Sequence, residues 1–212
     1  MLIRDYFDQL DDKEKEFCRN IALEYASMPL EEGYNYQVGD GVDAALNVLP
    51  LLLKPFPHDS KAIKETLLFT LFDSYPIGTV QRLSDYAVSA ILHNLWQESP
   101  EDAKSIFWGY LLLKPKFDEL CVSIRQENRE RNIYDFSNAS ALERLVVERK
   151  SEIAKVVSNQ LVDGEIPDIS DLDPSTLVTA FSLLPLKTTD ESHKRFARKI
   201  STVFSKLLRS NR

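Results

Sequence analysis

The sequence predicts an all-α protein built from antiparallel helical hairpins stacked side by side, with eight or nine helices in 212 residues. Apolar residues recur every three to four positions along most of the chain, which is the period of an amphipathic helix. Glycine is scarce, with 6 residues, while the helix-favouring Leu, Ala, Glu and Lys are abundant. The length suffices for one core, so we expect a single domain over 1–212, with a helix and loop in 1–41 and stacked helices in 42–209.

The helices of the first half are predicted from their apolar stripes. In 12–27 the stripe includes Phe17 and Ile21. The same spacing predicts helices over 42–53, 60–73 and 79–96. Residues 33–41 differ, because they hold three of the six glycines and alternate aromatic with polar side chains, which predicts a loop or a short hairpin.

Two helix starts are predicted from a capping residue followed by a first-turn proline, at Ser99-Pro100 and at Asp173-Pro174. The apolar stripe after Pro100 runs to Leu113, and a separate helix is predicted over 115–130 because proline commonly ends a helix.

The most strongly patterned stretches lie in the last third of the chain. A capping box at Ser140 opens a predicted six-turn helix over 140–162, which Gly164 ends. A final amphipathic helix is predicted over 191–209. Arg149 falls at the centre of the apolar stripe of 140–162, where its charge must reach water, pair with a carboxylate or meet a partner.

An internal echo favours a repeat architecture. Leu51–Pro55 and Leu111–Pro115 both read Leu-Leu-Leu-Lys-Pro, and Leu183–Lys187 is a looser copy, although any leucine-rich helix ending in Lys-Pro would look the same. Over about 42–209 the leucine-rich helices, proline turns and charged outer faces resemble HEAT- or armadillo-like helical repeats. That resemblance implies a scaffold that binds protein partners along a curved surface.

Charge is unevenly distributed along the chain. The net charge is −7, which argues against a general nucleic-acid-binding protein. Residues 1–60 hold 12 acids and 5 bases, whereas 190–212 hold 2 acids and 7 bases. The sequence shows no secretion signal and no membrane-length apolar run, and it has two cysteines, so we expect a cytoplasmic protein without a membrane span.

The sequence contains no motif for catalysis, for a cofactor or for a metal. The three histidines, His58, His93 and His193, are predicted to lie at the surface without catalytic neighbours. Cys18 and Cys121 lie near apolar helix stripes and are predicted to be buried. We therefore expect no enzyme, no cofactor and no metal site.

The helix over 191–209 is the main candidate interaction surface. Its apolar residues cover about 140° of the helix, and the other side is basic. The basic residues are Lys194, Arg195, Arg198, Lys199, Lys206 and Arg209. They could form an ordinary solvated face, or a site for an acidic protein, a nucleic acid or an anionic lipid.

Three functions follow from these observations. The first is a non-catalytic scaffold or adaptor that binds a protein partner, either by itself or as one part of a larger protein. The second is a nucleic-acid-associated adaptor that uses the basic helix at 191–209. The third is an enzyme with an unrecognised site. The sequence sets neither the partner nor the oligomeric state.

Overall fold

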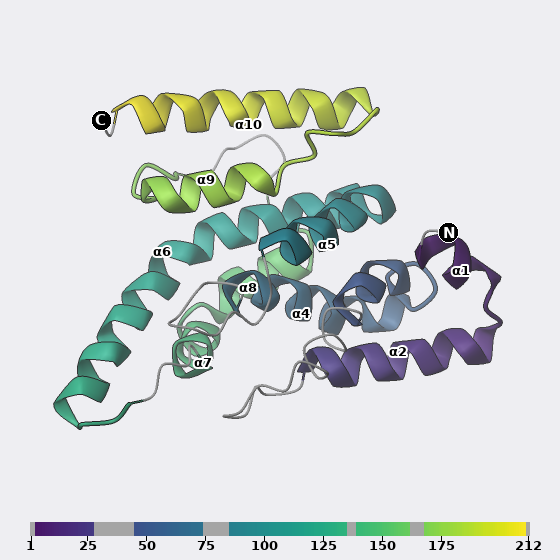
Figure 1. Cartoon of the computed structure of the whole chain (residues 1–212), viewed down its shortest axis with the longest axis horizontal. Helices are drawn as coiled ribbons and strands as arrows, with labels where there is room; N and C mark the ends of the chain where they lie inside the picture. Colours follow the sequence, from purple (N-terminus) through teal and green to yellow (C-terminus); the bar gives the residue numbers. More distant parts are fainter. Residues whose placement is uncertain (1–2, 28–44, 74–84, 135–138, 162–167, 211–212) are drawn as a thin grey trace.

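A computed structural model of the chain describes residues 3–27, 45–73, 85–134, 139–161 and 168–210. These residues form helices joined by short turns, and none of them lies in a strand, which confirms the all-α class. Figure 1 shows the helices packed against one another. The predicted hairpin at 33–41 lies outside the described residues.

The helices follow one another in this order: α1 (Ile3–Gln9), α2 (Asp12–Ser27), a helical segment over 45–52, η1 (Pro57–Asp59), α4 (Ser60–Asp73), α5 (Asp85–Glu98), α6 (Pro100–Glu130), α7 (Ala139–Glu148), α8 (Lys150–Val157), α9 (Pro174–Ser182) and α10 (Glu191–Ser210). The predictions for 12–27, 60–73 and 191–209 are confirmed to within one residue at each end. The short helix α1 is not predicted by the sequence pattern.

The longest helix, α6, is the centre of the packing. It contacts α4, α5, α7 and α8, and it crosses the middle of the molecule in Figure 1. Its buried aromatic side chains meet Phe72 of α4, whose ring centroid lies 5.5 Å from that of Tyr110 and 4.9 Å from that of Phe117. Residues before and after the middle of α6 therefore both contribute to the hydrophobic core.

The prediction that a helix ends near Leu113 and another begins at 115 is wrong, because α6 continues through Pro115. Proline has no N–H to donate to the carbonyl of Leu111, and its ring crowds that turn, so it normally bends a helix. Here Leu113 and Phe117 are both buried on either side of the proline. Their burial keeps the helix continuous, and Figure 1 shows α6 changing direction partway along its length.

The prediction of one six-turn helix over 140–162 is also wrong, because the chain breaks at Arg149 into α7 and α8. The break turns α8 so that it packs against both α4 and α6. Helix α8 then ends at Val157, since Asn159 adopts a left-handed φ of 56° and the N–H of Gln160 donates to the carbonyl of Lys155 at 2.9 Å. Gly164 lies outside the described residues.

The two copies of the Leu-Leu-Leu-Lys-Pro echo adopt different structures. The first leaves its helix after Leu52, whereas the second lies in the middle of α6. The echo therefore does not mark equivalent positions of a repeat. The resemblance to HEAT-like repeats stays a prediction.

The predicted cap at Asp173 is confirmed. Its carboxylate accepts hydrogen bonds from the backbone N–H of Ser175 at 2.8 Å and of Thr176 at 3.1 Å, and also from both hydroxyls. Partial burial raises the pKa of Asp173, but these hydrogen bonds outweigh it and lower the pKa to about 2. The carboxylate therefore stabilises the start of α9 in its ionised form.

Replacing Asp173 with alanine is expected to lower the free energy of unfolding by about 1 kcal/mol at pH 7, because two N–H groups of α9 lose their acceptor. The folded-state pKa lies below the ordinary value of 3.8. The ionic contribution is consequently present above about pH 4 and is lost as the pH falls toward 2. Urea unfolding at pH 7 and at pH 3 checks both statements.

The matched control is Asp171→Ala, which removes an exposed carboxylate from the same loop. Its free energy of unfolding should stay within about 0.5 kcal/mol of the wild type. If Asp173→Ala and Asp171→Ala have the same effect, or if the effect of Asp173→Ala is as large at pH 3 as at pH 7, the capping role is wrong.

Candidate functional site

Helix α10 is held against the rest of the protein by its apolar side. Ala197, Ile200 and Phe204 are buried. An aromatic cluster joins α10 to α5, α6 and α9, with these ring contacts: Phe196 to Trp96 at 5.4 Å, to Phe107 at 5.9 Å and to Trp108 at 5.9 Å, and Phe204 to Phe107 at 6.5 Å and to Phe181 at 6.1 Å. This packing fixes which side of α10 faces outward.

The turn between α9 and α10 is tied to α5. The indole N–H of Trp96 donates to the carbonyl of Leu183 at 3.2 Å, and Nε2 of His93 donates to the carbonyl of Leu184 at 3.3 Å. The prediction that His93 lies at the surface is therefore wrong. His93 is half-buried, because the turn that follows α9 contacts the face of α5 that carries it, and the pattern of α5 alone does not show this contact.

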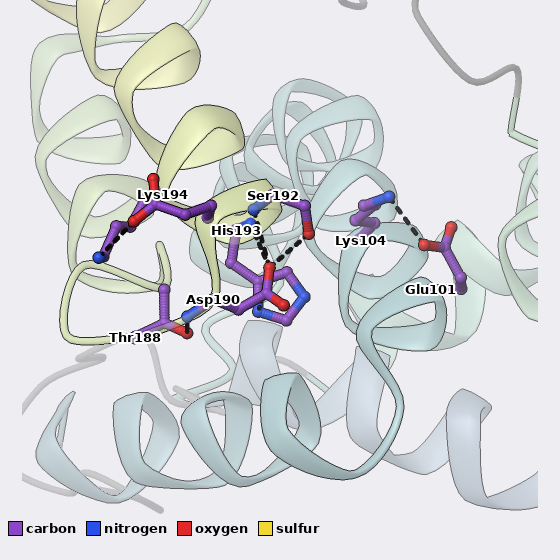
Figure 2. A network of polar contacts seen from close by, with 8 residues as sticks. Glu101, Lys104, Thr188, Asp190, Ser192, His193 and Lys194 are labelled. Carbon is purple, nitrogen blue, oxygen red and sulfur yellow. Dashed lines mark hydrogen bonds and ion pairs between the residues drawn. The ribbon is translucent and has the colours of Figure 1, made fainter.

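The start of α10 is capped by Asp190, as Figure 2 shows. Its carboxylate accepts from the backbone N–H of Ser192 at 2.8 Å and of His193 at 3.0 Å, and from the Ser192 hydroxyl at 2.5 Å. The Ser192 hydroxyl and the His193 N–H lower the pKa of Asp190 to about 2. Asp190 thus remains ionised and fixes the first turn of the helix.

His193 lies in this first turn of α10, and its ring packs against Trp96. Its ring centroid lies 5.5 Å from that of Trp96, its Nδ1 lies 4.0 Å from Oδ1 of Asp190, and its side chain is 12% exposed. The prediction of a surface position is wrong for His193 because Trp96 covers it. It is confirmed for His58, which is exposed.

A groove with a volume of about 780 Å³ runs along α10 beside the turn that follows α9. Its charged lining residues are all basic, namely Lys194, Arg198, Lys206 and Arg209. Three hydroxyl side chains, Ser201, Thr202 and Ser205, lie between these cations, and Pro185, Leu186 and Ala197 supply the apolar part of the lining. We call this surface the α10 groove.

The α10 groove brings together four of the six basic residues predicted as a surface on this helix, Lys194, Arg198, Lys206 and Arg209. The other two on this helix, Arg195 and Lys199, are exposed and do not line it. At 100° per residue they project beside Lys206, so they extend the same basic face toward solvent.

Most cations of the α10 groove are not neutralised by nearby carboxylates. Lys194 pairs with Glu191, with 2.7 Å between Nζ and Oε1. Among the residues that the structure describes, Arg198, Lys206 and Arg209 form no ion pair. The positive charge is thus concentrated in the part of the groove beyond the first turn of α10.

Arg149 lies apart from this surface. It sits at the junction of α7 and α8, where its guanidinium is 3.0 Å from Oε1 of Glu152. The predicted position at the centre of one apolar stripe is wrong, since the helix breaks at this residue. Arg149 is a local ion-pair residue and does not line the α10 groove.

The hydroxyl and turn residues of the groove were missed by the sequence analysis. A signal was present for the hydroxyls, because Lys194, Arg198, Thr202 and Lys206 repeat at every fourth position and therefore share one helix face. No local signal identifies Pro185 and Leu186, since they reach the groove through the pairing of α9 with α10.

A smaller cavity of about 300 Å³ lies near α1 and the end of α5. Its lining is mixed in charge, and Arg4 pairs there with Glu98 at 3.2 Å and with Asp8 at 3.8 Å. This neutralisation within the chain leaves less charge for a ligand than the α10 groove offers.

Burial raises the pKa of the Cys121 thiol to about 11, so this residue is a buried thiol at neutral pH, as the sequence predicts. Cys18 is half-buried.

Within the described ranges, no three His, Cys, Asp or Glu side chains are grouped so that they could hold a metal ion. No helix in that part of the chain is long and apolar enough to cross a membrane.

Comparison with known proteins adds no further assignment. No protein-family model matches this chain, and none of the curated proteins compared with it is similar enough to count as a relative.

Proposed function

We propose that this chain is a non-catalytic helical adaptor that binds a partner protein, and that it does so through the α10 groove. The observation that carries the proposal is the concentration of Lys194, Arg198, Lys206 and Arg209 in one groove of an otherwise acidic chain. A surface of this kind attracts a partner whose contact region is acidic.

The packing of α10 against the rest of the protein supports the proposal. Ile200 and Phe204 anchor the helix, and the aromatic cluster around Phe196 fixes its rotation. The position of the helix that carries the cations is consequently set before a partner arrives. A preformed surface loses less conformational entropy on binding than a mobile one.

The charge of the remaining surface favours a protein partner over a nucleic acid. The net charge is −7, and two acidic residues, Asp190 and Glu191, stand at the start of α10. A long polyanion would extend beyond the groove over the remaining surface, and the acidic net charge of the chain disfavours this. A protein segment can place its acidic residues within the groove alone.

The proposal is tested with immobilised wild-type protein and two variants. Arg198→Glu/Lys206→Glu reverses two cations of the α10 groove. The matched control, Lys150→Glu/Lys155→Glu, makes the same change of net charge at two exposed positions of α8. Captured polypeptides are identified, purified and measured individually against all three proteins.

We expect a polypeptide that binds the wild type and the α8 control directly and binds the α10 variant at least tenfold more weakly, in a salt-dependent manner. If no captured polypeptide depends on the α10 cations, the proposal is wrong. If the wild type binds a labelled oligonucleotide and the α10 variant does not, the proposal of a protein partner is wrong and the nucleic-acid-associated adaptor takes its place.

A further inference from the structure

We infer that the α10 groove binds an extended acidic peptide segment of about seven residues, with acidic side chains at its first, third and seventh positions. This inference rests on the proposed function and specifies the chemistry of the partner. It follows from the length of the groove, from the spacing of its cations and from the hydroxyl groups between them.

The length of the groove matches a short extended segment. Its lining on α10 runs from Lys194 to Arg209. At a rise of 1.5 Å per residue these ends are about 22 Å apart along the helix. An extended chain advances about 3.3 Å per residue, so about seven residues span this distance.

The spacing of the cations sets the positions of the acidic side chains. Lys194 and Arg198 are about 6 Å apart along the helix axis, and Lys206 and Arg209 lie about 18 and 22 Å from Lys194. In an extended peptide, residues on the same side recur every second position, about 7 Å apart. Acidic residue three therefore meets Arg198, and residue seven falls between Lys206 and Arg209. Acidic residue one reaches Lys194, where it takes the place of Glu191 as the partner of that ammonium group.

The hydroxyl groups favour an extended peptide over a helix. Ser201 and Ser205 line the groove between Arg198 and Lys206. Within the described part of the chain their hydroxyls make no hydrogen bond. A hydroxyl both donates and accepts, which suits the free N–H and C=O groups of an extended backbone. A helix offers few such groups, because its backbone is paired internally.

The apolar part of the lining is too small for the usual binding of an amphipathic helix. It consists of Pro185, Leu186 and the buried Ala197. Helices that dock in grooves bury an apolar stripe with residues from several turns. The α10 groove instead offers charge and hydroxyl groups along its length, as in the recognition of acidic motifs by clustered basic residues.

The test uses three fluorescent heptapeptides with identical composition, each with three glutamates and four serines. One carries glutamate at positions 1, 3 and 7, and the second is its reversed sequence, which covers the opposite chain direction. The third has all three glutamates adjacent. Binding is measured by fluorescence anisotropy at low salt against wild type, Arg198→Glu/Lys206→Glu, Ser201→Ala/Ser205→Ala and the α8 control.

The wild type and the α8 control should bind one of the spaced peptides at least tenfold more tightly than the clustered peptide. The charge-reversal variant should lose at least tenfold, and the serine variant at least threefold, with unchanged circular dichroism. Equal binding of all three peptides, or unchanged binding by the serine variant, overturns the inference of an extended segment. Neither result contradicts the adaptor proposal, which the capture experiment tests separately. Absence of peptide binding by the wild type also overturns the inference.

Discussion

Replacing Asp102 with alanine is expected to lower the free energy of unfolding by about 3 kcal/mol, because it leaves the charge of Lys64 buried without its carboxylate. Lys64 is 6% exposed. Its Nζ lies 3.2 Å from Oδ1 of Asp102 and 3.4 Å from Oδ1 of Asn159. Urea unfolding followed by circular dichroism measures the loss.

The cluster around Asp102 joins three helices. Asp102 is in the first turn of α6, Lys64 is on α4, and Asn159 follows α8 and donates to Asp102 at 2.7 Å. The hydroxyl of Ser99 also donates to Asp102. Partial burial raises the pKa of Asp102, but the hydrogen bonds from Ser99 and Asn159 and the charge of Lys64 lower it overall. The ionised form therefore holds the helices together.

Two comparisons make this prediction specific. Glu101→Ala removes the neighbouring carboxylate, which pairs with Lys104 at 2.8 Å on the exposed side of α6, and should change the stability by at most about 0.5 kcal/mol. Lys64→Met in the Asp102→Ala background removes the orphaned charge and should recover at least about 1 kcal/mol. A double variant less stable than Asp102→Ala would contradict the buried-charge explanation.

The second large effect is expected at Gly109, where alanine should lower the free energy of unfolding by about 2 kcal/mol. A Cβ at this position would lie 2.7 Å from both Cγ atoms of Val156 and 3.3 Å from Cδ1 of Leu68. Val156 is fully buried and β-branched, so it has few alternative rotamers. Overpacking then outweighs the gain of about 1 kcal/mol that alanine normally brings to a helix.

A double-mutant cycle tests this explanation. In the Val156→Ala background the contact at 2.7 Å is gone, so adding Gly109→Ala should be neutral or stabilising by up to about 1 kcal/mol. Thermal and urea unfolding of the four proteins give the coupling energy. If Gly109→Ala has the same effect with and without Val156, the close approach of α6 and α8 does not limit this position.

The local parts of the fold could be predicted because their signals are local. The apolar stripe of 191–209 and the cap at Asp173 each depend on residues within one or two turns. Both are confirmed by the structure. The basic side of α10 follows from the same stripe, so most of the α10 groove could be predicted too.

Other features depend on contacts between distant segments. Pro115 predicts a helix end, yet burial of Leu113 and Phe117 keeps α6 continuous. The pattern around Arg149 predicts one helix, yet the chain breaks there and α8 packs against both α4 and α6. In each position the free energy of tertiary packing outweighs a local preference of a few kcal/mol or less.

By itself, the sequence determined the helical class, the apolar side of most helices and the separation of acidic and basic ends, because each depends on the order of neighbouring side chains. The tertiary structure alone decided that Lys64 meets Asp102, that the turn after α9 contacts His93, and that Pro185 and Leu186 border the cations of α10. A helical period shows which side of a helix will be buried, but not which helix will cover it. That choice depends on how side chains far apart in the sequence fit together.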